Sequence, residues 1–456
     1  MDNPEHKQED RKAIPTVSTI LPTGELVELV YDPEKRQTAL AVGSADAVSI
    51  EESVEFGGTR LVPWKATNNL IRHETLLLPE KPEEFGTVAD LIAEIEVHCT
   101  RYIDLSAELR RVVAGYILLT WVYDAFNELP YLRFRGDLGS GKTRALIVAG
   151  SLCYRGFFAS GASTVSPIFH TLDTFNGTLI LDEADFRFSD EKAELSKILN
   201  NGNVRGFPVL RTMMTPQKEF DPRAFIVYGP KVIAMRGHFD DPALESRFIT
   251  IDMEAGTVAP KAPINLPDAH KEEARHLRNK LLAYRFANRL TVSINESLYD
   301  DTLTPRANQI TLPLLSLISD PLLRDAARSV VRQTHADTLS DRASSPAGQL
   351  IALLVELASK DERKTLPIGE LTAAFIERYG GDYERPITNR YVGSLLRRAL
   401  NIRTYKSHGN YQVPLDRERI AVRAEHYGVD SPSNTATGGR GDVGDVKPGT
   451  QVPTSQ

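Results

Sequence analysis

The chain has 456 residues, of which 41% are hydrophobic and 25% are charged, so it is long enough for two or three globular domains. Its net charge of −7 at pH 7 excludes a uniformly basic nucleic-acid-binding protein, and any surface of that kind must be local. Cys99 and Cys153 are the only cysteines and have no paired spacing, which excludes a disulfide framework and a cysteine zinc site.

The start of the chain and its most apolar run predict a cytoplasmic protein with no membrane partner. Residues 1–14 are polar, lack the apolar stretch of a signal peptide and are expected to be disordered. The run from Val112 to Val122 is too short to span a bilayer and is flanked by charged residues, so it predicts a buried helix. Two buried free thiols fit a reducing compartment.

Residues 15–80 are predicted to form a small β-rich domain. Turn signals divide their alternating pattern at Pro22-Thr23-Gly24, Asp32-Pro33 and Gly57-Gly58. Residues 87–104 and 106–126 then follow a 3.6-residue apolar period and predict two helices, the second with Ser106 in its cap region. These helices lead directly into the next motif, so we expect them to pack on its sheet.

The segment Gly136–Thr143, GDLGSGKT, fits the phosphate-binding pattern G-x-x-x-x-G-K-[ST] at every fixed position. Residues 131–135 before it alternate like a strand, and residues 144–152 after it predict a helix, which is the context that this motif requires. Lys142 is expected to reach the β- and γ-phosphates of ATP, and the Thr143 hydroxyl to ligate Mg²⁺. The rest of the phosphate cradle would come from Gly136, Gly139, Ser140 and Gly141. A glycine-rich surface turn is the alternative.

A second element completes the predicted site. Residues 178–181 are an apolar run that predicts a buried parallel strand, and Asp182 and Glu183 follow at its carboxyl end. Ligands of an open α/β sheet bind at that edge. Asp182 is therefore predicted to hold the Mg²⁺ shell and Glu183 to polarise the attacking water. A solvated acidic turn is the alternative.

The following residues predict the remaining elements of an α/β core. We expect a helix at residues 191–199, followed by two strands at residues 205–210 and 224–228 that a polar turn joins. A short buried strand at residues 231–234 and a closing strand at residues 249–253 complete the sheet. Residues 268–330 are mainly helical in pattern, with a break at residues 300–306.

The order of these motifs resembles a compact AAA+ P-loop ATPase of the helicase type, near the superfamily 3 and MCM helicases. The resemblance rests on the phosphate loop, the acidic strand end, the hairpin, the short strand and the segment ALESRF at residues 243–248. It is similar to replication helicase proteins of phages, plasmids and integrated mobile elements. The resemblance implies an oligomeric ring with ATP between subunits, an ATPase core over residues 86–260 and a helical lid over residues 261–340.

The resemblance also implies roles for individual arginines. Arg247 matches the arginine finger that acts on the γ-phosphate of the neighbouring subunit. A surface salt bridge is the alternative. Arg306 resembles a sensor 2 arginine at the start of a lid helix, and an ordinary surface arginine is equally consistent. At the sensor 1 position the family commonly has Asn, Thr or Ser, whereas this chain has Met235 and Arg236, so either Arg236 has part of that role or the polar sensor is missing.

Helicase rings of this kind usually project a β-hairpin into the central pore. The corresponding insertion contains basic side chains at Arg205, Arg211 and Lys218. Phe207 and Phe220 lie between them, and this combination suits single-stranded DNA because cations follow phosphates and rings stack on bases. Acidic side chains are also present in the insertion, and a solvated hairpin without a ligand is the alternative.

The residues 345–428 predict a winged helix of three helices and a hairpin. Its third helix and wing, residues 385–413, contain no carboxylate. In an acidic protein this is a local signal for contact with the phosphate backbone of duplex DNA. The predicted DNA-binding residues are Arg390, Arg397, Arg398, Arg403 and Lys406. A winged helix that binds protein is the alternative, and residues 429–456 predict a disordered tail.

These patterns together predict a multidomain α/β protein that hydrolyses ATP with Mg²⁺ in a homo-oligomeric ring. The predicted function is a DNA helicase or translocase in replication of a mobile element. Two alternatives stay open: a DNA-bound AAA+ initiator or regulator that does not unwind DNA, and a protein-remodelling AAA+ ATPase.

Overall fold

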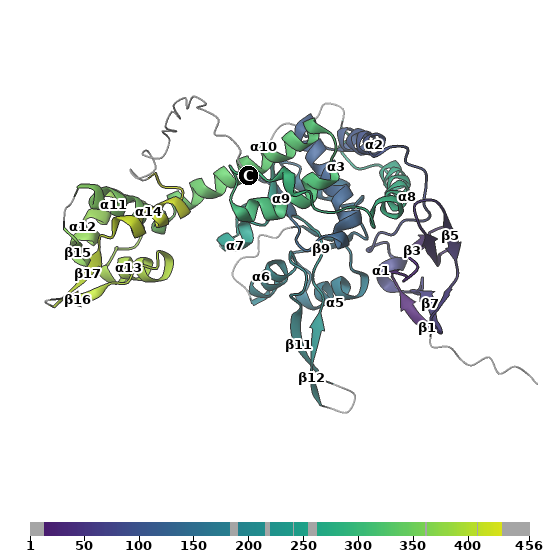
Figure 1. The fold of residues 1–456 in the computed structure, drawn as a ribbon, viewed down its shortest axis with the longest axis horizontal. Helices are drawn as coiled ribbons and strands as arrows, with labels where there is room; N and C mark the ends of the chain where they lie inside the picture. Colours follow the sequence, from purple (N-terminus) through teal and green to yellow (C-terminus); the bar gives the residue numbers. More distant parts are fainter. Residues whose placement is uncertain are drawn as a thin grey trace, which may run out of the picture. The chain divides into compact units, whose positions relative to one another are not determined.

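The computed structural model describes residues 13–182, 190–214, 219–239, 241–253, 262–360, 363–407 and 409–430 (Figure 1). The chain forms two compact units that meet in sequence between His335 and Ala336. Within the described residues, no helix is both long and apolar enough to cross a bilayer.

The first unit begins with two small antiparallel-rich sheets. One has the order β2-β3-β4-β5, with strands Ser18–Ile20, Leu26–Asp32, Gln37–Gly43 and Val48–Glu51. The other has the order β1-β7-β6, with strands Ala13–Thr16, Thr59–Pro63 and Val54–Phe56. The segment predicted to be β-rich therefore consists mainly of strands, followed by the short helix α1 (Asn69–Arg72).

A buried ion cluster joins the four-stranded sheet to the rest of the first unit. Glu28 on β3 is 1% exposed and lies 2.5 Å from Arg155 Nη2 and 2.8 Å from Arg285 Nε. Arg285 also pairs with Asp124 at 2.8 Å. Burial raises the pKa of Glu28, but the two guanidiniums outweigh burial and lower this pKa below its ordinary value. Four segments that are distant in sequence therefore share one set of charges.

Helices α2 (Val88–Tyr102) and α3 (Ala107–Val122) precede the central sheet, as predicted. Thr87 and Asp90 form a capping box on α2, and the Ser106 hydroxyl accepts a hydrogen bond from the amide of Leu109 on α3. Cys99 is fully buried here, and so is Cys153 beyond the next helix, and burial raises the pKa of each thiol to about 12.

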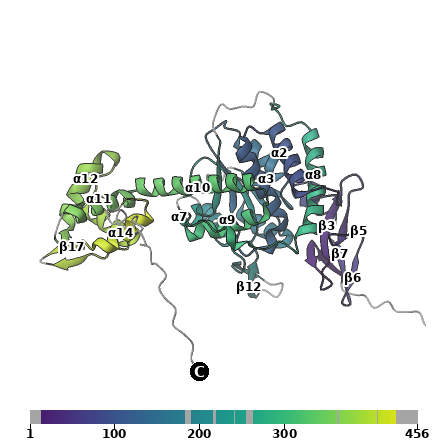
Figure 2. The same ribbon diagram turned by 45° about the horizontal axis from the view of Figure 1, so that its top comes forward.

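The central sheet is fully parallel and has the order β14-β8-β13-β10-β9. Its strands are β8 (Tyr131–Arg135), β9 (Phe157–Ser160), β10 (Leu179–Asp182), β13 (Lys231–Met235) and β14 (Phe248–Asp252). Alternate residues of β8 enter different hydrophobic cores. Leu132 and Phe134 pack in the core that contains α3 and α4 (Lys142–Gly150), whereas Tyr131 packs in the core of α5 (Val165–Phe175) and α6 (Asp190–Asn201). Helices therefore cover both faces (Figure 2).

A hairpin projects from this layered body (Figure 1). Its strands are β11 (Val209–Met214) and β12 (Phe220–Phe225), which lie between α6 (Asp190–Asn201) and β13. A hairpin was predicted here, but its strands lie elsewhere. Residues 211–223 were predicted as the turn between the strands, yet Pro222 among them lies within β12 opposite Thr212. Proline is tolerated there because a two-stranded ribbon has two open edges.

The rest of the first unit is helical, as residues 268–330 predicted. It contains α8 (Ala269–Asn288), the short turn η2 (Glu296–Leu298), α9 (Pro305–Leu317) and α10 (Pro321–Ser344), which continues into the second unit. The Thr304 hydroxyl caps α9, and Pro305 occupies its first position.

The second unit contains α11 (Pro346–Lys360), α12 (Ile368–Tyr379) and α13 (Asn389–Ser394). Its sheet has the order β15-β17-β16, with strands Thr365–Pro367, Asn410–Pro414 and Tyr405–Ser407. Three features differ from the sequence expectation: the strand β15, the helix α14 (Arg417–His426), and a π-helical turn at Leu395–Ala399 in place of a straight third helix.

Candidate functional site

The phosphate loop connects the carboxyl end of β8 to the amino end of α4. Gly141 is the N-cap of α4 and adopts a left-handed φ of 87°, and Gly139 has a φ of 80°. Side chains rarely adopt this conformation, so both turns favour glycine. No side-chain hydrogen bond caps α4, which leaves its first amides directed at the loop.

Two observations test whether this loop fits a phosphate group. A Cβ atom on Gly136 would lie 2.3 Å from the Met253 carbonyl oxygen, so only glycine allows this close approach. The Ser140 hydroxyl is buried, and no hydrogen-bond partner for it exists in the described part of the chain. A buried polar atom without a partner is uncommon, and a hydroxyl in this position fits a loop that binds phosphate oxygens. Lys142 Nζ donates to the Asp137 carbonyl 2.5 Å away, at the same loop.

The acidic end of β10 meets this loop. The Thr143 hydroxyl donates to Asp182 Oδ1 over 3.3 Å, which brings together the two groups predicted to hold Mg²⁺. Glu183, the predicted activator of water, lies outside the described residues. In the described ranges no three His, Cys, Asp or Glu side chains are grouped to hold a metal, so a cation here would also need oxygen ligands from a nucleotide.

The strand β13 lies between β8 and β10, so its carboxyl end lies between the phosphate loop and Asp182. Met235 ends this strand and is buried, whereas Arg236 follows it and is exposed. Arg236 therefore lies at the carboxyl edge of the sheet, beyond the end of the strand between β8 and β10.

Two arginines of β8 form ion pairs that the sequence did not predict, and the first of these pairs is buried. Arg133 on β8 is 1% exposed and pairs with Glu245 at 2.7 Å. Glu245 also accepts a hydrogen bond from the amide of Phe239 over 2.7 Å. Arg135 forms a bidentate pair with Asp252, at 2.6 and 2.8 Å. Alternation along β8 places both arginines on one face, but their partners come from distant segments, which no local pattern identifies.

Arg247 lies at the opposite edge of the sheet. It directly precedes β14, and its carbonyl oxygen accepts a hydrogen bond from the amide of Tyr131, the first residue of β8. The phosphate loop begins after the last residue of β8, about 16 Å away at 3.3 Å per residue. Arg247 Nε donates to Asn203 Oδ1 over 2.8 Å. This position does not allow Arg247 to reach a nucleotide in its own loop.

Arg306 lies with Arg247 rather than with the phosphate loop. Its guanidinium is 3.6 Å from a carboxylate oxygen of Glu128, which precedes β8. Burial and the nearby Arg306 charge lower the pKa of Arg247, so the two guanidiniums are neighbours. Arg306 therefore lies away from the phosphate loop of its own chain, where it was predicted to contact the nucleotide.

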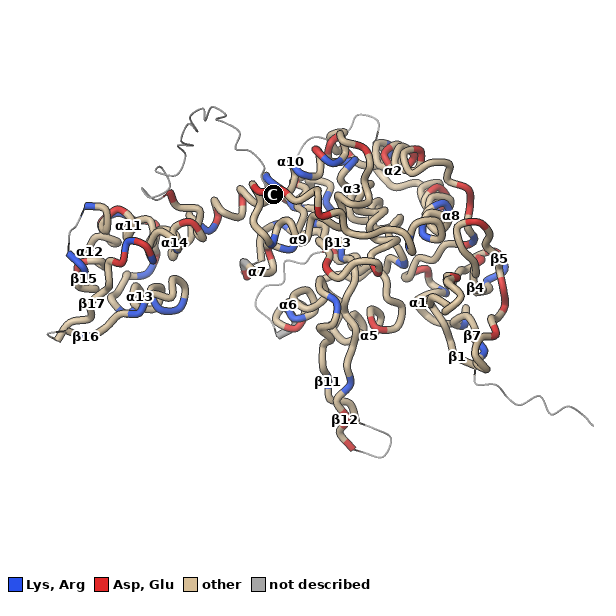
Figure 3. The backbone as a smooth tube through the Cα atoms, in the orientation of Figure 1, with Lys and Arg blue, Asp and Glu red and all other residues tan. Residues whose placement is uncertain are grey.

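Two of the three cations predicted for the hairpin bind groups elsewhere in the chain. Arg205 was predicted in the insertion, but it precedes β11 and donates to the Asp124 carbonyl oxygen. Arg211 on β11 pairs with Glu194 of α6. Lys218 lies outside the described residues. The described tip is instead apolar and acidic (Figure 3). Its exposed side chains include Met214, Glu219, Phe220 and Asp221.

The cations predicted for the second unit have the opposite environment. All five are exposed, and none has an ion pair with a carboxylate of the described chain; Figure 3 shows basic positions along α13 and the turn after it. They are Arg390, Arg397, Arg398, Arg403 and Lys406. Exposed tyrosines accompany them on the short strands: Tyr405 is 48% exposed and Tyr411 is 52% exposed. This surface suits an extended anion.

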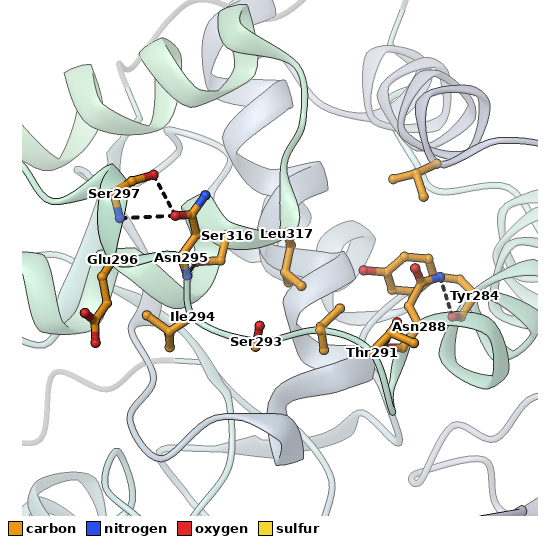
Figure 4. Close-up of a pocket in the computed structure, with 12 residues that line it drawn as sticks. Tyr284, Asn288, Thr291, Ser293, Ile294, Asn295, Glu296, Ser297, Ser316 and Leu317 are labelled. Atoms are coloured by element: carbon orange, nitrogen blue, oxygen red, sulfur yellow. Dashed lines mark hydrogen bonds between the residues drawn. The ribbon is translucent and has the colours of Figure 1, made fainter.

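A separate cavity of about 810 Å³ lies between the end of α8, η2 and the end of α9 (Figure 4). Hydroxyl and amide groups line it, and Asn295 Oδ1 accepts hydrogen bonds from the amide and hydroxyl of Ser297 at 3.1 and 2.7 Å. The predicted site residues do not line this cavity, so it is distinct from the candidate nucleotide site.

No protein-family model matches the chain, and no curated protein matches it. Solved structures similar to it include helicases and Orc1 and Cdc6 proteins. The SCCmec type IV Cch active helicase has 14% identity and a TM-score of 0.42, over 91% of this chain and 80% of that chain. The apo NrS-1 C-terminal region has 12% identity and a TM-score of 0.35, over 85% and 95%. The Aeropyrum pernix Orc1 protein in complex with DNA has 14% identity and a TM-score of 0.21, over 70% and 91%.

Proposed function

We propose that this chain is an ATP-dependent DNA helicase or translocase. The observation that supports the ATPase part most directly is the meeting of the phosphate loop with Asp182 at the carboxyl edge of a parallel sheet. Lys142 and the amides at the start of α4 would bind the phosphates of ATP. Thr143 and Asp182 would hold Mg²⁺, which supplies positive charge against the phosphate oxygens when bound.

The proposed reaction is hydrolysis of the terminal phosphoanhydride bond. Glu183 would orient a water molecule and accept its proton, the water oxygen would bond to the γ-phosphorus, and the bond to the β–γ bridging oxygen would break to give ADP and phosphate. Because the transferring group carries spread negative charge, catalysis depends mainly on positioned cations. Lys142 is the cation of the same chain, with Arg236 at the neighbouring strand end.

The proposed assembly is a ring in which ATP lies between two copies. Arg247 lies about 16 Å from its own phosphate loop along β8, so an arginine finger at this residue would have to act on the nucleotide of another copy. The helices after β14 would form the lid of the core.

The proposed DNA contacts lie mainly in the second unit, as a winged helix. Its five exposed cations without carboxylate partners support contact with phosphates, because each such contact releases counterions from DNA. The hairpin would act on a single strand through apolar contact and stacking by Phe220, since Arg211 is already paired with Glu194.

The rate of ATP hydrolysis, measured without DNA, with single-stranded DNA and with duplex DNA, tests this function on protein of recorded solution mass. We expect DNA to stimulate hydrolysis by an oligomer, and a fork substrate to be unwound only with ATP and Mg²⁺. Stimulation without unwinding would favour the initiator or regulator. Hydrolysis that DNA does not change would favour protein remodelling.

A further inference from the structure

Another cavity, of about 610 Å³, lies in the first unit where β3 meets the core. Its walls also come from the end of α1, residues 76–78, α4, β9 and the first half of α8. This volume is in the range of pockets that hold small molecules. Among the described residues that line it there is none of the phosphate loop, so it is distinct from the candidate nucleotide site.

Backbone contacts fix the walls of this cavity. Leu76 forms an isolated antiparallel bridge with Phe157, the first residue of β9. The amide of Tyr31 on β3 donates to the Pro79 carbonyl over 2.9 Å, which attaches the amino-terminal sheet to the same segment. A cavity with fixed walls needs little reorganisation when it binds a ligand.

Arg278 of α8 brings a positive charge to the wall. It is 7% exposed, its Nη1 donates to the Ser151 carbonyl over 2.9 Å, and its Nε donates to the Leu78 carbonyl over 3.3 Å. Both partners are neutral, and across the described ranges no carboxylate lies within ion-pair distance of this guanidinium. Burial lowers the pKa of Arg278 to about 10, so the side chain is still charged at neutral pH.

A buried cation without a counter-ion is unfavourable, because backbone carbonyls replace only part of the hydration that the charge has lost. Two carboxylates line the cavity, Glu74 and Glu272, and both oppose the lowering of the Arg278 pKa from beyond ion-pair distance. Glu272 is already bound to Arg275. The wall therefore leaves Arg278 without a direct counter-charge.

The other basic side chains of the wall are Lys271 and Arg72. Lys271 lies 3.7 Å from Asp268. Arg72, at the end of α1, is exposed and has no ion pair in the part of the chain that the structure describes. Arg72 and Arg278 thus outnumber the one remaining carboxylate, Glu74, and the cavity has an excess of positive charge.

Much of the remaining wall is apolar. Leu76 and Leu78 contribute on one side, Ile147 comes from α4, Phe158 from β9, and Leu266 precedes α8. A free inorganic anion would leave this surface in contact with water. A ligand that fills the cavity would gain from apolar contact as well as from charge.

We propose that this cavity binds a small molecule that has one anionic group, a carboxylate or a phosphate monoester, on an apolar body. Arg278 and Arg72 would bind the anion, while Ile147 and Phe158 would contact the apolar body. The bound anion would supply the counter-charge that Arg278 lacks. This inference does not depend on the proposed ATPase function, because no group of the candidate nucleotide site lines the cavity.

Calorimetric titration of the full chain with phenylacetate and with phenyl phosphate tests the proposal. We expect one molecule of either probe to bind per chain, with the same affinity in the presence and absence of Mg²⁺ and ADP. The tighter of the two probes identifies the anionic group. The neutral probe 2-phenylethanol should bind at least about 10-fold more weakly, because charge-assisted hydrogen bonds are stronger than neutral ones.

Two variants assign the probe to the cavity. Arg72→Gln is expected to weaken binding of the tighter probe about 10-fold and to retain the fold, because this side chain is exposed. Arg278→Gln is expected to weaken binding about 100-fold, with circular dichroism as the check on folding. Arg60→Gln is the matched control, since Arg60 is an exposed arginine of the same unit outside the cavity wall, and should retain wild-type affinity.

Four results would overturn the inference. They are wild-type affinity in Arg72→Gln, equal affinity for the charged and neutral probes, no saturable binding of either anionic probe below about 10 mM, and competition between the probes and ADP. Competition would place the probe in the phosphate loop, which would support the proposed nucleotide site and remove this one. If Arg278→Gln does not fold, the Arg72→Gln titration decides alone.

Discussion

The Thr143 hydroxyl and the Asp182 carboxylate lie 3.3 Å apart although 39 residues separate them in the chain. The contact links the first turn of α4 to the last residue of β10, across the carboxyl edge of one parallel sheet. Because β13 separates β10 from β8, a nucleotide in this position would contact the ends of three strands. This relationship makes the loop and the acidic strand end one site.

Lys142→Ala is expected to abolish ATP hydrolysis while the fold is retained. Lys142 is the first residue of α4 and its Nζ donates to the loop carbonyl of Asp137, so its loss removes a phosphate-binding charge rather than core packing. Steady-state phosphate release measures the effect, with circular dichroism as the check on folding. Lys197→Ala on α6 is the control and should leave hydrolysis unchanged. Normal turnover by Lys142→Ala would remove the assignment of the phosphate loop.

Replacing two exposed cations of α13 and its π-helical turn is expected to weaken DNA binding and its salt dependence. For Arg397→Ala with Arg398→Ala, the slope of log K against log salt should fall by about two, because each phosphate contact contributes about one. Fluorescence anisotropy with duplex DNA over a salt series measures this slope. The control is Arg363→Ala with Arg378→Ala in the same unit, because those arginines pair with Glu370 and Glu356. Equal slopes for the two double variants would contradict the proposed DNA surface.

Glu28→Gln is expected to lower the free energy of unfolding by about 3 to 5 kcal/mol, since removal of one partner leaves buried charges uncompensated. Arg155 and Arg285 are each 1% exposed and both depend on this carboxylate. Urea unfolding at pH 7 measures the change. Glu55→Gln disrupts an exposed pair with Arg60 and should cost less than about 1 kcal/mol. A similar result for both variants would show that the buried cluster is not a stability determinant.

Acid is expected to destabilise the first unit through His98. Burial, and then the neighbouring His270, lower the pKa of His98 to about 4, whereas Glu273 acts in the opposite direction and Arg101 adds to the lowering. The folded pKa is below the unfolded one, so the unfolded chain binds more protons between pH 6.5 and 4. Stability should therefore fall as pH decreases through this range, by roughly 3 kcal/mol for His98 at pH 4.

The comparison of urea unfolding at pH 7 and pH 4 in wild type and His98→Phe isolates this contribution. Tyr102 and His270 pack against the His98 ring at centroid distances of 5.0 and 5.1 Å, so phenylalanine preserves an aromatic contact. The variant should lose less stability on acidification than the wild type. An identical loss in both proteins would exclude His98 as the source.

Local signals in the sequence predicted the elements that depend on neighbouring residues. The glycine-rich loop and the Ser106 cap depend on contacts within a few residues, and both occur in the structure. The Asp182 site was also predicted, because parallel strands place their carboxyl ends at one edge.

Features that depend on long-range partners were not predictable. The strand β15 exists only because it pairs with β17, almost fifty residues later. Arg205 and Arg211 are basic in the sequence, but each donates to a group on another element, the Asp124 carbonyl and the Glu194 carboxylate. Glu128 belongs to no sequence motif, because its ion-pair partner, Arg306, lies on a distant helix.

Cys99 and Cys153 are inaccessible and, with thiol pKa values of about 12, exist almost entirely as the unreactive protonated form at neutral pH. They are also the only cysteines of the chain. A maleimide dye or a crosslinker would therefore react with a newly introduced surface cysteine and leave the native pair untouched. A label on one introduced cysteine can thus measure distances between subunits, or the approach of DNA to the hairpin, without prior removal of any native thiol.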